Sequence, residues 1–431
     1  MKTALIDNLI HRTVLDNGIV LLVSENQGSD IIAGRIFIRT GSCYEPKEKA
    51  GLLNLLASLM TKGCADLSSV EIAETIESVG ASLSTDAGTD YFVLSLKTVS
   101  ADFLDIFTLG EKILRSPTFP PQQIELEKKL ALQDIRSQKE QPFSIAFEKL
   151  REVMYADHPY GISVLGTENS INNITRDDLI AYHQTHFRSD QIVISIAGKI
   201  TPLQAEELVN NTFKNWQIPP EPKPSLNLPA INININNINP KKCLYPMTTQ
   251  QSIIILGYMG TSVKDPNFAA LKVLATYLGN GLSSRLFVEL RERQGLAYDV
   301  SAMYSTRLFP ASFIVYIGTA PENTLVAYQG LYEEVALLSQ QELSAEALQT
   351  AKNKIIGQYA LGKQTNASIA YIYGWYEILG LGIEFDQKFP QIINHVTSQD
   401  LMVVANKYLQ DPYLSLVGPE TAIQIIMQHL S

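Results

Sequence analysis

The stretch Ile174–Gly198, ITRDDLIAYHQTHFRSDQIVISIAG, has a second copy in Val396–Gly418, VTSQDLMVVANKYLQDPYLSLVG. Each copy has the pattern of a helix followed by an apolar strand. In each copy a threonine, Thr175 or Thr397, stands three residues before an aspartate, which is the spacing of a helix N-cap resembling a capping box. The pair indicates that one structural unit is written twice in this chain.

Two further pairs of segments repeat in the same order. A strand pattern, a proline turn and an apolar helix occupy 31–60 and again 252–279, and a solvated helical segment rich in Glu and Lys occupies 118–138 and again 341–359. Strands and helices mixed in this order are typical of an α+β fold. We therefore expect two homologous domains, each a mainly antiparallel sheet with helices packed on one face.

A proline-rich segment separates the two copies. Ile218–Pro229, IPPEPKPSLNLP, contains five prolines, which exclude a helix or a central strand. We expect an N-terminal domain over 1–217, a linker over 218–235 and a C-terminal domain over 236–431. The alternation of apolar residues and Asn in Ile231–Asn239 predicts a strand at the start of the second domain.

Composition restricts the class of protein. The formal net charge is −10 and the pI about 5.2, which argues against a nucleic-acid partner. No apolar run is long enough to span a bilayer, and the N-terminus lacks the pattern of a targeting segment. Cys43, Cys64 and Cys243 are too few for a disulfide framework or a zinc ribbon, so we expect buried thiols. A cytoplasmic protein without membrane or nucleic-acid partners fits best.

The most informative motif is Gly51–Gly63, GLLNLLASLMTKG. Its framework resembles the metal-binding helix of the pitrilysin and mitochondrial processing peptidase family, whose inverted motif is His-x-x-Glu-His. The two motif histidines lie one helical turn apart and bind the same zinc, with the glutamate as general base. In this chain the three positions are Asn54, Ala57 and Ser58. Without the resemblance, the segment would be a buried amphipathic helix with Asn54 and Ser58 on its more polar side.

The family's third zinc ligand is a glutamate on a later helix. The resemblance places Glu127 at the upstream position of that pattern and Asp134 at the ligand position. An Asn, Ser and Asp set offers no imidazole or thiolate, and neutral oxygens are poor zinc ligands beside those groups. Ala57 also removes the general base. We expect no metal and no catalytic residue in this chain.

A second family motif is intact. Leu282–Tyr298, LSSRLFVELRERQGLAY, resembles the C-terminal-domain signature in which an Arg and a Tyr seven residues later contact the substrate. The resemblance assigns Arg291 and Tyr298 to substrate binding, since a guanidinium can hold a carbonyl or carboxylate and a phenol can donate to a developing oxyanion. The alternative is that Arg291 pairs with Glu289 or Glu292 and that Tyr298 packs at a strand start.

Three weaker patterns have ordinary interpretations. Gly80–Thr89 resembles the family's edge strand that receives peptide by strand addition, with Ser84 in place of a common Asn. Gly279–Ser284 imitates a phosphate loop but follows a predicted helix rather than a strand, so we expect no dinucleotide site there. His183 and His186 are three residues apart without a further ligand nearby, so we expect a solvated helix face.

The resemblance implies a non-catalytic, substrate-binding subunit of a heterodimeric zinc metallopeptidase that acts on peptides. In the family, such chains pair around a closed chamber, and the homologous partner carrying His-x-x-Glu-His would supply the zinc. Two alternatives remain open from the sequence. One is a structural subunit like the respiratory-complex core proteins, and the other is a homodimeric peptide-binding protein without proteolytic activity.

Overall fold

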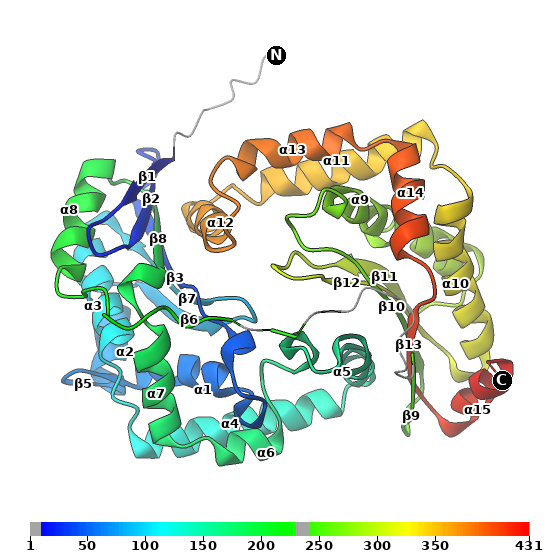
Figure 1. The fold of residues 1–431 in the computed structure, drawn as a ribbon, viewed down its shortest axis with the longest axis horizontal. Coiled ribbons are helices and arrows are strands. Elements are labelled where there is room, and N and C mark those ends of the chain that lie inside the picture. Colours follow the sequence, from blue (N-terminus) through cyan, green and yellow to red (C-terminus); the bar gives the residue numbers. More distant parts are fainter. Residues whose placement is uncertain (1–9, 227, 230, 232–240, 431) are drawn as a thin grey trace. The chain divides into compact units, whose positions relative to one another are not determined.

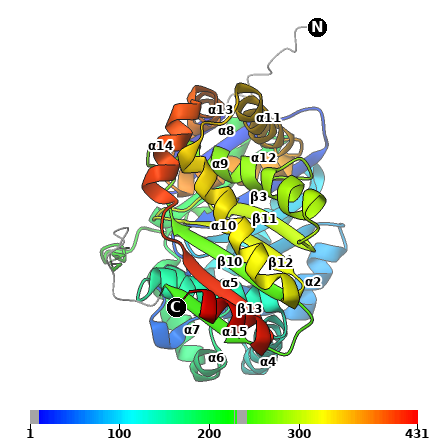
Figure 2. The same cartoon turned by 90° about the vertical axis from the view of Figure 1, so that its right-hand side faces the viewer.

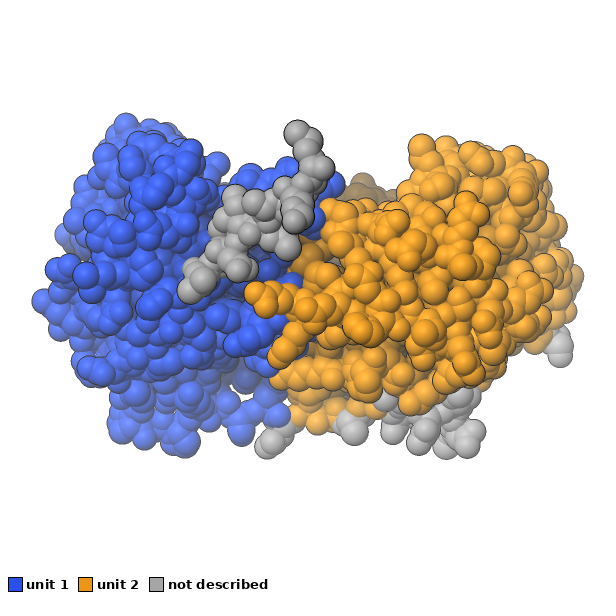
Figure 3. Space-filling model, turned by 90° about the horizontal axis from the view of Figure 1, so that it is seen from above, with its two compact units in different colours: residues 1–135, 163–227, 360–386 blue, residues 136–162, 228–359, 387–431 orange. Residues whose placement is uncertain are grey.

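The computed structural model describes residues 10–226, 228–229, 231 and 241–430. They form two compact units, which Figure 3 colours separately. Unit 1 takes the described residues within 1–135, 163–227 and 360–386, and unit 2 takes those within 136–162, 228–359 and 387–431. Most of the predicted opening strand Ile231–Asn239 lies outside the described residues.

Unit 1 contains a six-stranded sheet in the order β1-β2-β8-β3-β7-β6. Its strands are β1 (His11–Val14), β2 (Val20–Glu25), β3 (Ile31–Ile38), β6 (Ser82–Ala87), β7 (Phe92–Val99) and β8 (Ile192–Gly198). Only β2 and β8 pair in parallel, and the other neighbours are antiparallel. A short hairpin of β4 (Gly63–Cys64) and β5 (Leu67–Ser68) lies apart from this sheet.

Most helices of unit 1 contribute to one core on one face of the sheet. They are α1 (Leu52–Leu59), α2 (Ser69–Glu77), α3 (Phe103–Arg115), α4 (Pro121–Lys139, whose last turn belongs to unit 2), α6 (Glu168–Asn173), α7 (Arg176–His186) and α8 (Pro202–Phe213). Alternate residues of β3, namely Ile32, Ile36 and Ile38, belong to this core. The period of two is that of a strand whose faces meet different surroundings.

Helix α12 (Asn366–Ile378) packs on β3, β8 and β2 from the opposite face (Figure 1). Phe37 of β3, which points away from the core of Ile36 and Ile38, meets α12 at Gly374. A Cβ atom added to Gly374 would lie 2.3 Å from the Phe37 ring, so a glycine is needed for this close approach. The predicted arrangement of helices on one face therefore holds for most helices of unit 1, and α12 adds a helix on the other face.

Unit 2 repeats this sheet with one strand fewer. The order is β11-β12-β10-β13-β9, formed by β9 (Lys242–Pro246), β10 (Ser252–Met259), β11 (Asp299–Tyr304), β12 (Ser312–Thr319) and β13 (Tyr413–Gly418). Again one pair, β9 with β13, is parallel. Every residue of β10 is buried, as expected for a strand covered on both faces. The predicted α+β fold with two homologous, mainly antiparallel sheets is confirmed.

The helices of unit 2 are α5 (Pro142–Tyr155), α9 (Phe268–Gly279), α10 (Thr324–Gln340), α11 (Ala345–Leu361), α13 (Phe385–His395), α14 (Ser398–Tyr408) and α15 (Glu420–His429), with the ends of α11 and α13 reaching into unit 1. Helix α10 runs across the sheet in Figure 2. Helix α5 covers the face on which Gly257 of β10 meets Leu150 and Met154. No helix in the described part of the chain is long and apolar enough to cross a membrane.

The two compact units do not correspond to the two halves of the chain on either side of the linker. Helix α5 comes from the N-terminal half but packs on the sheet of unit 2, and α12 comes from the C-terminal half but packs on the sheet of unit 1. The reason is that each helix buries an apolar face on that sheet. The compact units thus exchange the segments 136–162 and 360–386, whereas the domains 1–217 and 236–431 with the linker 218–235 follow the order of the chain and stay a prediction.

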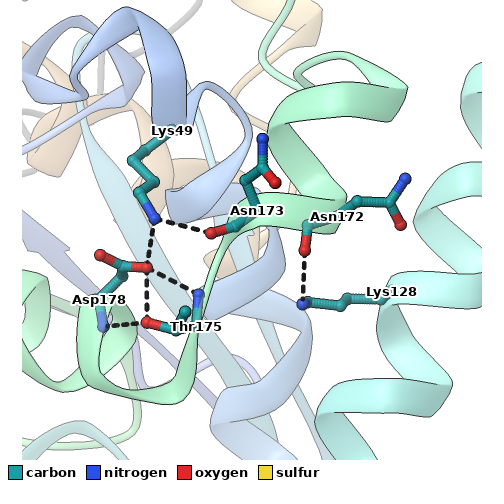
Figure 4. Close-up of polar contacts among 6 residues, drawn as sticks. All are labelled: Lys49, Lys128, Asn172, Asn173, Thr175 and Asp178. Atoms are coloured by element: carbon teal, nitrogen blue, oxygen red, sulfur yellow. Dashed lines mark hydrogen bonds and ion pairs between the residues drawn. The ribbon is translucent and has the colours of Figure 1, made fainter.

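The duplicated helix starts are as predicted. Thr175 and Asp178 form a complete capping box at α7, and Thr397 and Asp400 form one at α14. Figure 4 shows the first of these boxes, in which Lys49 donates to the Asp178 carboxylate at 2.6 Å. The hydrogen bonds from Thr175 and the ion pair with Lys49 lower the pKa of Asp178, against the opposing effect of its burial.

Candidate functional site

Helix α1, which carries the motif Asn54, Ala57 and Ser58, begins at a half-buried acidic cap. The Glu45 carboxylate accepts hydrogen bonds from the backbone N–H groups of Gly51 at 2.8 Å and Leu53 at 2.6 Å. Burial raises the pKa of Glu45 to about 8, although these two hydrogen bonds oppose the shift. Gly51 has a φ of 90°, which favours glycine at this position.

The motif positions of α1 have their expected helical spacing but form no ligand set. The Ser58 hydroxyl donates to the carbonyl of Asn54 at 3.1 Å, one turn earlier. Ala57 is 3% exposed and offers only a methyl group. Neither a neutral amide nor a hydroxyl bonded to its own helix fits zinc, which requires imidazole, thiolate or carboxylate ligands.

The acidic positions on α4 do not complete a site either. Glu127 is buried and forms an ion pair with Lys62 at 3.1 Å, while Asp134 lies exposed two turns later. Lys62 belongs to the Lys-Gly pair that ends the α1 motif. Its ion pair with Glu127 could not be read from the sequence. In the described residues, no group of three or more His, Cys, Asp and Glu is arranged to hold a metal ion.

Strand β6 lies at the edge of the unit 1 sheet and directly beside α1. Thr85 of β6 donates its hydroxyl to the carbonyl of Ala57 at 2.7 Å. Residues along β6 alternate between half-buried and exposed, with Ser82, Ser84 and Asp86 exposed. The edge strand predicted within Gly80–Thr89 is confirmed as β6, and this strand contacts helix α1.

Arg291 and Tyr298 are joined by a hydrogen bond in unit 2. Arg291 lies in a π-helical segment, Phe287–Arg293, and donates to the carbonyl of Tyr298 at 2.9 Å. Its guanidinium also lies over the Phe287 ring, 5.0 Å from the centroid. The Tyr298 side chain is 62% exposed, just before β11. Both side chains therefore stand at the surface of unit 2.

The acidic neighbours of Arg291 have other partners. Glu289 forms ion pairs with Arg285 at 2.9 Å and with Arg293 at 2.7 Å, and Arg285 also pairs with Glu334. Within the described part of the chain, Arg291 forms no ion pair with Glu289 or Glu292. A guanidinium has five N–H donors, so most of those on Arg291 remain available to a ligand.

The expectation of a solvated face for His183 and His186 is wrong. His186 is 9% exposed, with its ring 4.2 Å from that of Tyr182, and His183 is bonded through Nε2 to the carbonyl of Leu114 at 2.7 Å. Burial lowers the pKa of His186 to about 4. Both imidazoles pack against aromatic rings, which the polar pattern of α7 concealed.

Other sequence-based interpretations are partly confirmed. Cys43 and Cys64 are buried free thiols as predicted, whereas Cys243 is half-buried. Gly279–Ser284 follows helix α9, as expected. The Asn280 side chain in this loop is bonded to Gln358 at 2.9 Å, and its carbonyl accepts from Lys354 at 2.9 Å.

Comparison with known proteins assigns the chain to a family. The family model described as "Insulinase (Peptidase family M16)" matches residues 20–168, and the one described as "Peptidase M16 inactive domain" matches residues 173–355. The uncharacterized zinc protease YmxG of Bacillus subtilis is 26% identical over 95% of this chain and 98% of its own length. An uncharacterized zinc protease of Rickettsia felis is 24% identical, with 94% and 96% covered.

Solved structures share the fold along nearly the whole chain. The peptidase M16 inactive domain from Pseudomonas fluorescens superposes with a TM-score of 0.86 at 23% identity, covering 95% of this chain and 98% of that one. A protease from Helicobacter pylori superposes with a TM-score of 0.87 at 18% identity, with 96% and 99% covered. These structures share the fold, and the two family models, in consecutive order over residues 20–168 and 173–355, show that the chain belongs to peptidase family M16.

Proposed function

We propose that this chain is the non-catalytic, substrate-binding subunit of a heterodimeric zinc metallopeptidase that degrades or processes peptides. The observation that supports this most is the contrast between the two family motifs of this chain. Helix α1 carries Asn54, Ala57 and Ser58 at the metal-site positions, whereas Arg291 and Tyr298 stand exposed and joined by a hydrogen bond. The first set fits no zinc, and the second set fits a peptide backbone.

The roles of the two exposed side chains follow from their chemistry. Arg291 can donate to a peptide carbonyl or carboxylate, and Tyr298 can donate its phenolic hydroxyl to an oxyanion that develops during hydrolysis. Edge strand β6 would add a substrate segment by backbone hydrogen bonding. The homologous partner, carrying His-x-x-Glu-His, would supply zinc, water and general base. The proposal includes a cytoplasmic location, in keeping with the free thiols.

The test first isolates a partner by co-purification with this chain and then compares variants in a heterodimer reconstituted with a partner that carries His-x-x-Glu-His. Arg291→Ala and Tyr298→Phe should each lower peptide turnover by roughly 10²–10³-fold, the effect typical of losing one transition-state donor. Arg293→Ala is the matched control because Arg293 is equally exposed in the same segment but bonded to Glu289. It should cleave at the wild-type rate.

Size-exclusion chromatography of each variant must accompany the kinetics, because an assembly defect would imitate a catalytic one. Normal assembly with wild-type turnover in both variants would reject the role of the Arg/Tyr pair and favour a structural subunit. A chain that recovers only as a homodimer and binds peptide without cleavage would favour the peptide-binding alternative.

A further inference from the structure

A small cavity in unit 1 lies between β3 and α12. Its volume is about 280 Å³, and it is lined by Arg35, Gly362, Ala367, Ser368, Tyr371 and Ile372. All six residues belong to unit 1, and they lie on the face of the sheet that α12 covers. None of them belongs to the α1 motif or to the Arg291–Tyr298 pair.

Arg35 lines this cavity and forms no ion pair with any described residue, although the Asp86 carboxylate acts on it electrostatically. One terminal nitrogen donates to the backbone carbonyls of Gly34 at 3.0 Å and Leu96 at 3.4 Å. The Nε atom is buried and has no hydrogen-bond partner in the described part of the chain. Burial lowers the pKa of its guanidinium, against the smaller opposing effects of Tyr371 and of the Asp86 carboxylate.

An unpaired, partly buried guanidinium is unfavourable in the free protein and favours an anion beside it. Tyr371 adds a second polar group, since its hydroxyl is hydrogen-bonded to that of Tyr91. When Tyr91 is the donor in this pair, the proton of Tyr371 is left to donate to a ligand. A carboxylate can accept from the N–H groups on the second terminal nitrogen of Arg35, which donates to no described residue.

One face of the sheet connects edge strand β6, which would accept peptide, with the Arg35 cavity on β3. Ser84 of β6 is opposite Ser95 of β7, and Ser95 is opposite Arg35 of β3, so the three side chains form a row on one face. Two strand spacings separate β6 from β3, which is roughly 10 Å. Lys97 lies on the same face, is exposed and forms no ion pair with any described residue. The face thus carries Arg35 and Lys97 near the edge strand, together with the exposed carboxylate of Asp86 on β6.

We propose that the Arg35 cavity is an anchoring site for a carboxylate of the bound peptide. The peptide would pair with β6, cross the open face along the Ser84–Ser95 row and place its carboxylate against Arg35 and Tyr371. Two sources share this chemistry, the free C-terminus of a peptide and an Asp or Glu side chain. This inference rests on the proposed peptide-binding function and adds a substrate class to it, namely peptides with an anionic group near one end.

The test measures binding to the isolated full chain by isothermal titration calorimetry, so that no partner and no turnover are needed. The probes are three N-acetylated peptides of Ala, Leu and Gln with equal length. One ends in a free carboxylate, one ends in an amide, and one ends in an amide after a terminal Glu. The wild-type chain should bind at least one carboxylate peptide about tenfold more tightly than the neutral amide, the worth of about one charged hydrogen bond.

Arg35→Gln should abolish this preference, and Arg35→Lys should keep part of it, because lysine retains the charge without the planar fork. Lys214→Gln is the control for net charge, since it removes one exposed positive charge from the C-cap of α8. It should leave the preference unchanged. Arg293→Ala should also retain the tenfold ratio, because Arg293 lies in unit 2 and is paired with Glu289. Circular dichroism establishes that each variant is folded.

The comparison between the two carboxylate peptides identifies the source of the anion. Tighter binding of the free C-terminus alone assigns the cavity to chain ends, and tighter binding of the Glu peptide assigns it to acidic side chains. Equal affinity of wild-type protein for all three peptides, or a preference that survives in Arg35→Gln, would overturn the inference. So would the absence of any binding at millimolar peptide. Loss of turnover in Arg291→Ala with no carboxylate preference would leave the proposed function standing without this site.

Discussion

His158 in unit 2 is an imidazole enclosed by aromatic rings. It is 1% exposed and lies within 6.2 Å, between ring centroids, of Tyr155, Tyr160 and Phe309. Its Nδ1 accepts the backbone N–H of Tyr160 at 3.1 Å, so the neutral form is the bonded one. Burial lowers the pKa of His158 to about 4. The charged form is therefore disfavoured in the folded protein.

This burial predicts a loss of stability in mild acid. The unfolded chain binds a proton at His158 with a pKa near 6.5, whereas the folded chain binds it only near 4, so the stability contributed above pH 6.5 is lost as the pH falls toward 4. Between pH 7.5 and pH 5 the wild type should lose roughly 2 kcal/mol more than His158→Gln. Urea denaturation at both pH values measures the difference. Equal pH dependence in the two proteins would contradict the assignment.

At the same scale, the ion pairs around Glu289 show what sequence spacing can decide. Arg285 and Arg293 stand four residues before and after Glu289 and pair with it, whereas Arg291 stands two residues away. Side chains two apart do not face each other on a helix, so the alternative pairing of Arg291 with Glu289 could have been rejected from the sequence. The hydrogen bond from Arg291 to the Tyr298 carbonyl could not have been predicted from the sequence, because it depends on the turn between the two residues.

Among the described helices, α5 and α12 are the two that pack on the sheet from the other half of the chain. Both contacts are close. Gly374 of α12 approaches Phe37, and Gly257 of β10 approaches Met154 of α5, where an added Cβ would lie 2.6 Å from the sulfur.

Substituting these glycines should destabilise the fold through steric crowding. Gly374→Ala and Gly257→Ala should each lower the free energy of unfolding by about 1–3 kcal/mol, the usual cost of an overpacked core. Gly357→Ala is the matched control because Gly357 lies inside α11 with no atom near its added Cβ. That variant should gain up to about 1 kcal/mol from helix propensity. Thermal denaturation measures all three, and an equal response of Gly374 and Gly357 would refute the packing argument.

The elements that could be predicted are those with local signals. The capping boxes at Thr175 and Thr397, the apolar strands β8 and β13, and the helix of the Asn54 motif all follow from residues close in sequence. The exchange of α5 and α12 could not be predicted, because an amphipathic helix pattern does not state which sheet it covers. The cavity at Arg35 was missed for the same reason, since it forms only where α12 meets β3.

At the scale of the whole molecule, the two units share one strand order, and helix α1 has its own packing and cap in unit 1. The strand orders β2-β8-β3-β7-β6 and β9-β13-β10-β12-β11 correspond strand by strand. Helix α1 is held by its apolar residues, such as Leu53 and Leu56, and by the Glu45 cap rather than by any metal. The packing of α1 therefore does not depend on the motif positions Asn54 and Ser58.

The zinc content of the isolated chain tests the central claim, that this family member does not hold the catalytic metal. Protein purified without added metal and then dialysed against micromolar zinc should contain well under one equivalent by elemental analysis. The combined variant Asn54→His, Ala57→Glu, Ser58→His and Asp134→Glu is the positive control, because α1 keeps the spacing of the motif. It should take up zinc in nearly stoichiometric amount. One tightly held zinc per wild-type chain would contradict the claim.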